Sequence, residues 1–329
     1  MGNMNRKKVF TADCSRRELL CAGAVSAASL WLHGSASAAP GSPGDSLPGT
    51  VHVFSKHLQW LDYRGMAETA AEVGFDGVDL TVRPGGHVLP ERVEDDLPKA
   101  VEAAHKAGIQ IRMVTTAITD PRDALARSIL ATAGKLGIRY YRMGYYRYTD
   151  DRPIPEQLSE IKPMLADLAA LNEQHGLAGS YQNHAGAKYV GAPLWDLYWL
   201  LRDLDPRWLG SQYDVRHATV EGGTSWSNTL RLLGPHINTL VAKDFRWAQQ
   251  GGKWRAENCP LGEGMVDFPA YFKILKRERI AAPVSLHLEY PIGGAEHGAR
   301  RLTTSREHVT NAMRRDLSKL RAWLKQRST

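Results

Sequence analysis

Ionisable and amide side chains recur along this chain in short polar clusters, and each cluster follows an apolar run. The clusters are Lys56-His57, Arg83 to His87, Arg142 with Tyr145, Gln182-Asn183-His184, Asp214 to His217, Lys243 to Arg246, and His287 to Glu289. Sets of His, Asp and Glu can ligate a divalent cation: oxygen-rich sets favour Mg²⁺ or Mn²⁺, and imidazole also suits Zn²⁺ or Co²⁺. The same side chains can take up and return protons. The residue types therefore indicate a polar active site that combines a cation with acid–base chemistry.

Spacing within the clusters supports this interpretation to a limited extent. His287 and Glu289 are two residues apart, so in a strand they point to the same face. Asp214 and His217 are three apart across the end of a predicted strand, where the chain leaves the sheet and the two-residue alternation ends. No compact ligand motif is present, so the spacing alone does not define the site.

Roles can be assigned to these residues as hypotheses. Glu289 is the expected general base, His217 or His184 its proton partner, and Lys243 the group that stabilises developing negative charge. The alternative for Lys243 is a structural ion pair with Asp244 or Asp214. The expected substrate contacts, for each of which a plain surface role is the alternative, are Lys56, His57, Arg83, His87, Arg142, Asn183 and Arg246.

The elements that must position these residues alternate between short β-like runs and longer helical ones. The predicted strands are 50–55, 77–82, 109–116, 138–144, 178–183, 209–215, 238–244 and 283–289. The predicted helices are 63–73, 92–107, 122–136, 156–175, 193–204, 227–233, 268–279 and 305–325. Four glycines stand between a helix and the next strand, where the left-handed conformation ends a helix: Gly74, Gly108, Gly137 and Gly176.

Alternation with short connections predicts right-handed βαβ units and a parallel sheet. Eight such units fit a closed barrel, whereas an open doubly wound sheet would call for a glycine-rich phosphate loop after the first strand, and none is present. The predicted fold class is therefore α/β, a single-domain (β/α)8 TIM barrel over residues 50–329. In such barrels the carboxyl ends of the strands form one rim, and the polar clusters fall there.

The first 49 residues have a different character. Residues 1–38 combine basic residues, the apolar run 19–32 and Ala36-Ser37-Ala38, which predicts a cleavable secretory signal. The string Ser15-Arg16-Arg17-Glu18-Leu19-Leu20 is typical of a twin-arginine signal, so we expect a periplasmic protein with no stable membrane span after cleavage. An uncleaved membrane anchor is the alternative. Residues 39–49 are rich in Pro, Gly and Ser and are expected to be a linker.

Composition and net charge narrow the class of protein and its expected partners. The chain of 329 residues is 43% hydrophobic and 23% charged, as expected of a soluble globular protein. Several of the positive charges behind its net charge of +7 lie in the signal or are scattered along the last predicted helix, which argues against a nucleic-acid partner. The expected partner is a small carbohydrate, and the sequence leaves a homo-oligomer open.

Five motifs carry a family resemblance that extends from about residue 50 to the end of the chain. They are Gly74-Phe75-Asp76-Gly77-Val78-Asp79-Leu80, Tyr181-Gln182-Asn183-His184, Tyr213-Asp214-Val215-Arg216-His217, Lys243-Asp244-Phe245 and the run from Leu261 to Phe268. In order and spacing they resemble the sugar phosphate isomerase/epimerase family of xylose-isomerase-like barrels. The resemblance implies one divalent metal ion held by Glu, Asp, His and Glu on strands five to eight.

The chain departs from that ligand pattern at three positions. Asp214 matches the strand-six ligand, but Gln182, Val241 and His287 stand where the family has Glu, His and Glu. The metal hypothesis is therefore a rebuilt site of Gln182, Asp214, His287 and Glu289 around Mn, Mg, Zn or Co, with loss of the metal as the alternative.

The implied function is a metal-assisted isomerase or epimerase, or a related lyase or hydrolase, that moves a proton next to a carbonyl of a sugar. Export favours a free or oxidised sugar over a phosphorylated one. The alternatives are a non-catalytic periplasmic sugar-binding barrel, which Gln182 and Val241 favour, and an apurinic-site endonuclease, which would need more zinc ligands than the sequence offers.

Overall fold

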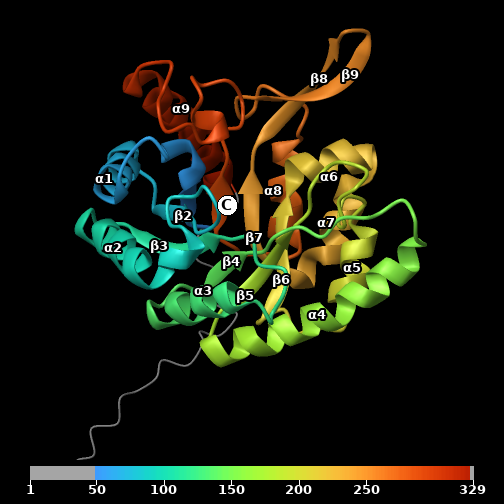
Figure 1. The fold of residues 1–329 in the computed structure, drawn as a ribbon. Coiled ribbons are helices and arrows are strands. Elements are labelled where there is room, and N and C mark those ends of the chain that lie inside the picture. The colour runs from blue at the N-terminus through green and yellow to red at the C-terminus, as the bar shows by residue number, and fades with distance from the viewer. Residues whose placement is uncertain (1–48, 327–329) are drawn as a thin grey trace, which may run out of the picture. The chain divides into compact units, whose positions relative to one another are not determined.

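Eight parallel strands close into a barrel in the computed structural model, which describes residues 49–326 (Figure 1). Each predicted strand overlaps an observed one, so the predicted (β/α)8 barrel is confirmed. The predicted signal segment, 1–38, and the linker up to residue 48 lie outside the described residues. The barrel strands, in their order around the barrel, are β1 (Val51–Phe54), β2 (Gly77–Thr81), β3 (Gln110–Thr115), β4 (Tyr140–Arg142), β5 (Ala178–Gln182), β6 (Leu209–Asp214), β7 (Ile237–Ala242) and β10 (Val284–Leu286).

Helices cover the outside of the barrel (Figure 1). They are α1 (Tyr63–Val73), α2 (Val93–Lys106), α3 (Ala124–Lys135), α4 (Ile154–His175), α5 (Trp195–Leu201), α6 (Val215–Gly222), α7 (Trp226–Leu233), α8 (Phe268–Arg277) and α9 (Arg306–Gln326). The short 3-10 helices are η1 (Ser55–Leu58), η2 (Pro90–Arg92), η3 (Gly223–Ser225), η4 (Gly234–His236) and η5 (Ala295–His297). Between residues 49 and 326 no helix combines the length and apolarity required to cross a membrane.

The helices end where the glycines predicted. Gly74 and Gly176 have φ values of 101° and 70° and accept the left-handed conformation directly after α1 and α4. Side chains without a glycine's freedom would be strained there. The apolar faces of these helices pack against outward-facing strand residues such as Leu80 and Leu240, which are fully buried.

One helix that the sequence analysis missed begins at the rim. Residues 209–215 were expected to be strand, but β6 ends at Asp214 and α6 starts at Val215. The Asp214 carboxylate accepts a hydrogen bond from the His217 backbone N–H at 3.1 Å, the arrangement that caps a helix. Arg216 and His217 therefore lie in the first turn of a helix directly above the barrel mouth.

A β-hairpin was also missed. Strands β8 (Asp244–Gln250) and β9 (Lys253–Cys259) pair antiparallel and project from the carboxyl end of the barrel beyond β7 (Figure 1). Gly251 and Gly252, with φ values of 55° and 75°, form the two-residue turn. This Gly-Gly pair is a recognised hairpin signal that the expected strand–helix alternation obscured.

The base of the hairpin is fixed by Asp244. Its carboxylate accepts hydrogen bonds from the backbone N–H groups of Gly262, Gly264 and Val266 at 2.9 to 3.1 Å. At Gly264 a Cβ would lie 2.3 Å from Asp244 Oδ1, so only glycine fits. Asp244 thus organises the loop before α8, and its side chain is not free to pair with Lys243.

Candidate active site

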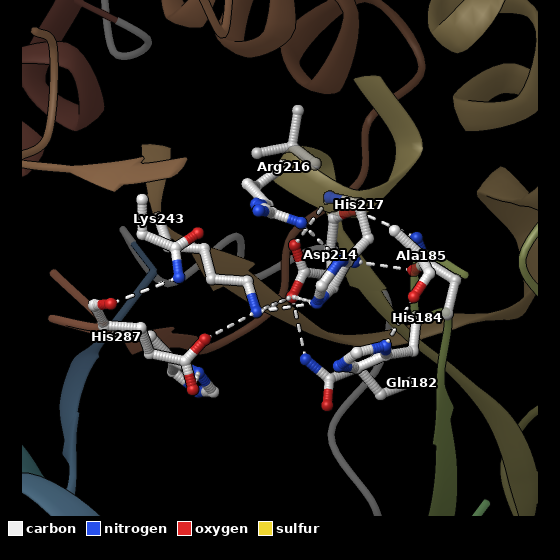
Figure 2. Close-up of polar contacts among 12 residues, drawn as sticks. Gln182, His184, Ala185, Asp214, Arg216, His217, Lys243 and His287 are labelled. Atoms are coloured by element: carbon white, nitrogen blue, oxygen red, sulfur yellow. Dashed lines mark hydrogen bonds and ion pairs between the residues drawn. The ribbon is translucent and has the colours of Figure 1, made fainter. Parts of the chain in front are cut away.

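The ammonium of Lys243 lies at the centre of the polar groups at the barrel mouth. Lys243 follows β7, and its Nζ is 3.0 Å from Asp214 Oδ2, 3.0 Å from Glu289 Oε2 and 2.8 Å from His217 Nε2. Its side chain is only 3% exposed. Figure 2 shows it reaching Asp214 and His217 from across the mouth. Residues from the ends of β6, β7 and β10 thus meet around one buried cation.

Asp214 is held on both sides. Oδ2 accepts hydrogen bonds from Lys243 and, at 2.7 Å, from the Gln182 amide, while Oδ1 caps α6. The Asn183 side chain bonds the backbone N–H and C=O of Asp214 at 2.8 and 3.0 Å. The Asp214 side chain is fully buried, and its contact with Lys243 Nζ orients that ammonium. Asn183, predicted to contact substrate, here positions Asp214.

Glu289 is the more accessible carboxylate. Its side chain is 22% exposed, and Oε1 accepts a hydrogen bond from Lys56 Nζ at 2.5 Å. Burial alone would raise the pKa of Glu289, but the charges of Lys243 and Lys56 outweigh burial and hold that pKa well below its ordinary value. Burial likewise lowers the pKa of Lys243, but Asp214 and Glu289 outweigh it, so the pKa is raised. Glu289 is therefore a carboxylate and Lys243 an ammonium across the neutral pH range.

His217 and His184 stack at the same mouth with ring centroids 4.0 Å apart. Burial and the neighbouring Lys243 lower the pKa of His184 to about 4 and that of His217 well below its ordinary value, so both rings are neutral. His217 Nδ1 lies 3.1 Å from Arg216 and Nε2 lies 2.8 Å from the Lys243 ammonium. Both neighbours can only donate and a neutral imidazole accepts at one nitrogen, so Nε2 is the acceptor for the shorter contact, with Lys243. Nε2 faces Lys243 and lies 3.6 Å from Asp214 Oδ2. His217 can therefore exchange a proton with the Lys243–Asp214 pair.

A second group of cations lies toward β2 and β4. Arg142 donates to Gln182 Oε1 at 3.0 Å and lies 5.2 Å from the centre of the Tyr145 ring. Tyr145 OH donates to the same amide oxygen at 2.5 Å. Arg83 and Lys56 lie over one ring, that of Phe54, at 5.5 and 5.4 Å. Lys56, Arg83 and Arg142 thus lie together at the mouth, and their contact with substrate stays a prediction.

Three residues that were predicted to contact substrate lie outside the cluster around Lys243. The two ring nitrogens of His57 bond the Ala295 carbonyl and the Leu288 N–H, and those of His87 bond Ser55 and the Leu58 carbonyl. Both rings are buried and tie the segment after β1 to its neighbours. Arg246 is exposed on β8, opposite Glu257 in the hairpin register. In the structure these residues do not contact the cluster around Lys243.

His287 lies between Phe54 and Glu289, directly after β10. Its ring stacks on Phe54 with centroids 4.3 Å apart, and Nε2 is 3.1 Å from Ser285 Oγ. Nδ1 lies 3.9 Å from Glu289 Oε1 and has no hydrogen-bond partner within the described part of the chain. His287 thus lines the mouth beneath Glu289.

The four side chains proposed as metal ligands do not fit a divalent cation as they lie. Gln182 turns its Nε2 to Asp214 and its oxygen to Arg142, and His287 is not directed at Asp214. The position between Asp214 and Glu289 is filled by the Lys243 ammonium. Over residues 49–326, moreover, no three His, Cys, Asp or Glu side chains are grouped so as to hold a metal ion.

Two contributors to the site were not singled out from the sequence. Arg216 bonds His217 and, through its other nitrogen, the Ala256 carbonyl of β9 at 3.0 Å. Asn258, also on β9, donates to the Glu289 carbonyl at 3.1 Å. Both contacts involve β9 of the hairpin. The Gly-Gly turn is therefore the sequence signal that could have indicated them.

Comparison with known proteins agrees with this architecture. The family model described as "Xylose isomerase-like TIM barrel" matches residues 67–308. No curated protein sequence matches the chain. Among solved structures, the chain is similar to a xylose isomerase domain protein from Planctomyces limnophilus, with 16% identity and a TM-score of 0.60 over 87% of this chain and 99% of that one.

Two further similar structures are D-psicose 3-epimerase with D-tagatose from Clostridium cellulolyticum H10 and 3-keto-D-glucoside 4-epimerase from E. coli. Each is 13% identical; the TM-scores are 0.62 and 0.61, over 84% and 83% of this chain and 99% of each of theirs. At such identities the likeness shows the fold alone. The family model, in contrast, covers well over half of the chain, including every strand of the barrel from β2 onward. The chain therefore belongs to the xylose isomerase-like TIM barrel family.

Proposed function

We propose that this protein is an enzyme that moves a proton next to a carbonyl of a carbohydrate and so isomerises or epimerises it. The observation that carries the proposal is the buried Lys243 ammonium within 3.0 Å of both Asp214 and Glu289 and 2.8 Å from His217. A cation, a carboxylate base and a neutral imidazole at one barrel mouth are the groups that such chemistry requires.

In the first step Glu289 removes the proton from the carbon beside the substrate carbonyl. The C–H electron pair becomes the new carbon–carbon double bond, and the carbonyl oxygen takes the negative charge of an enediolate. Lys243 donates a hydrogen bond to that oxygen. As the substrate oxygen takes over one lysine hydrogen bond, Glu289 loses part of the stabilisation that depresses its pKa and becomes a stronger base.

In the second step the proton returns to a different position. Delivery to the opposite face of the same carbon gives the epimer, and delivery to the former carbonyl carbon gives the isomer. His217 is the proton partner for the opposite face: its Nε2 takes a proton from the Lys243 ammonium and passes it to the carbon, and Glu289 returns the proton it removed to Lys243 across their 3.0 Å contact. His184 stacks against His217 and keeps its ring in place.

The similar structures support the reaction class. Two of them bear the names of sugar epimerases, which rearrange configuration beside a carbonyl. The metal that the family resemblance implies is replaced in this mechanism by the positive charge of Lys243. A built-in ammonium supplies the same electrostatic stabilisation without ligand exchange.

Solvent isotope exchange tests the proposed function directly. The protein is incubated in D₂O with a panel of ketoses, aldoses and their uronic acids, and loss of the C–H signal beside the carbonyl is followed by ¹H NMR. We expect deuterium incorporation and a new isomer for at least one sugar. A sugar that binds without exchange would instead identify the non-catalytic sugar-binding barrel.

We also propose that the protein is exported by the twin-arginine pathway and works in the periplasm. The basis is the Ser-Arg-Arg-Glu-Leu-Leu string at residues 15–20 and the small-residue site at residues 36–38. Replacing both Arg16 and Arg17 by Lys is expected to leave the protein in the cytoplasmic fraction at precursor size. Unchanged periplasmic recovery of that double variant would contradict the assignment.

A further inference from the structure

We infer that the carbohydrate bound at this mouth carries an oxyanion, a carboxylate or phosphate, which Arg83 and Arg142 recognise. The inference rests on the proposed function for the location of the reacting carbon. The arginines themselves belong to a separate part of the mouth, and in the described part of the chain neither forms an ion pair with a carboxylate.

Charge at the mouth is not balanced by the protein. Five cationic side chains gather there, and two carboxylates lie among them. A third carboxylate in the described range, Asp79, is hydrogen-bonded to Thr115 and Ser285; the charges of Arg142 and Arg83 act on it, but it forms no ion pair with either. The cationic side chains are Lys56, Arg83, Arg142, Arg216 and Lys243. Within residues 49–326, Glu289 and Asp214 form their short ion pairs with lysines, and neither pairs with an arginine.

The hydrogen bonds of Arg142 are made to neutral groups. Arg142 is only 7% exposed, yet its hydrogen-bond partners are the Gln182 amide and the Tyr145 hydroxyl. Its Nε has no hydrogen-bond partner among the described residues. Burial, followed by the nearby guanidinium of Arg142, lowers the pKa of Arg83 to about 10. A buried cation without a counterion is costly, and two adjacent ones are costlier.

Arg83 makes fewer contacts than Arg142. It lies over the Phe54 ring, and no hydrogen bond or ion pair of its guanidinium is found in the described part of the chain. Five N–H donors in a planar fork match the two oxygens of a carboxylate or those of a phosphate. Arg83 and Arg142 together therefore offer an anion site that the protein's own carboxylates leave open.

The strand order sets the direction of the ligand. Arg83 follows β2 and Arg142 ends β4. Asp214 ends β6, and Lys243 and Glu289 follow β7 and β10, on the other half of the closed barrel. Gln182, at the end of β5, bonds both Arg142 and Asp214 and joins the halves. The oxyanion accordingly lies over β2 to β4, and the reacting carbon lies over β6 to β10.

Calorimetric binding with matched sugars tests this inference. The probes are D-glucuronate and D-galacturonate, their neutral parents D-glucose and D-galactose, and D-glucose 6-phosphate. We expect at least one anionic probe to bind about tenfold or more tightly than its neutral parent, because charge-assisted hydrogen bonds are the stronger ones. The arm that binds more tightly, uronate or phosphate, identifies the source of the oxyanion.

Variants localise the effect. Arg83→Gln and Arg142→Gln are expected to abolish the preference for the anion, while Arg64→Gln, at an exposed arginine on α1, retains it. If no anionic probe binds more tightly than its neutral parent, or if Arg83→Gln keeps the full preference, the inference is wrong. Binding needs no turnover, so a charge preference without isotope exchange refutes only the proposed function. Exchange confined to neutral sugars refutes only this inference.

Discussion

Glu289→Gln is expected to reduce turnover by about 10²–10⁴-fold, because an amide cannot accept the substrate proton. The substitution keeps the shape of the side chain, although its single oxygen can replace only one of the two acceptors that Lys56 and Lys243 use. Binding of the substrate should therefore change much less than kcat. The measurement is kcat and KM for the sugar identified by isotope exchange.

The matched control for this variant is Glu263→Gln. Glu263 lies in the loop before α8, is exposed, and is paired with Lys319 at 3.6 Å on the outside of the barrel. Its replacement should leave turnover unchanged. Full activity of Glu289→Gln would show that Glu289 is not the base.

The same carboxylate predicts the acid limit of activity. Since the pKa of Glu289 is held well below 4.5 by Lys243 and Lys56 against the effect of burial, the free enzyme keeps its base ionised in mild acid. A carboxyl whose pKa is lower in the folded state stabilises the fold above its unfolded pKa and loses that contribution as the pH falls through the folded value. We therefore expect kcat/KM to remain on its plateau at pH 5, and a fall centred near pH 6 would exclude Glu289 as the titrating group.

Lys243→Met is expected to have the second large effect, on both stability and catalysis. It removes the cation that lies between two carboxylates while leaving both of them at the mouth. Breaking a buried ion pair from one side typically costs about 3–5 kcal/mol of unfolding free energy. Loss of the group that stabilises the enediolate should further reduce kcat by about 10²–10³-fold. Denaturant unfolding and steady-state kinetics measure the two effects separately.

Lys56→Met is the matched comparison for Lys243→Met. Lys56 also pairs with Glu289, but it contacts one carboxylate and its side chain is 16% exposed against 3% for Lys243. A solvated pair contributes less, so we expect a smaller loss of stability. Equal losses of unfolding free energy in the two variants would mean that the central position of Lys243 adds nothing to stability.

The Lys243 position also decides how the protein responds to metal. With the ammonium in place, Mn²⁺ should not raise the melting temperature and EDTA should not lower activity. Lys243→Ala leaves Asp214, Glu289 and His217 facing one another, and this variant should gain stabilisation from Mn²⁺ or Zn²⁺. One equivalent of a divalent ion bound by the unmodified protein, with activity lost on its removal, would restore the metal mechanism.

The sequence alone was sufficient for the barrel and for the position of the rim. Strand and helix periods and helix-ending glycines such as Gly74 and Gly176 are local properties, and each acts within a few residues of itself. Once eight strands are parallel and closed, their carboxyl ends must share one rim, so the prediction that Asp214, Lys243 and Glu289 gather there followed from topology.

What each rim residue does was decided only by the tertiary structure. Gln182, Asp214 and Glu289 look like metal ligands in sequence, but the long Lys243 side chain from β7 reaches between the two carboxylates. His57 and His87, predicted to contact substrate, instead satisfy buried backbone and hydroxyl groups. The physical reason is that a side chain's role depends on which charges and donors lie within about 3 Å of it, and those neighbours come from distant parts of the chain.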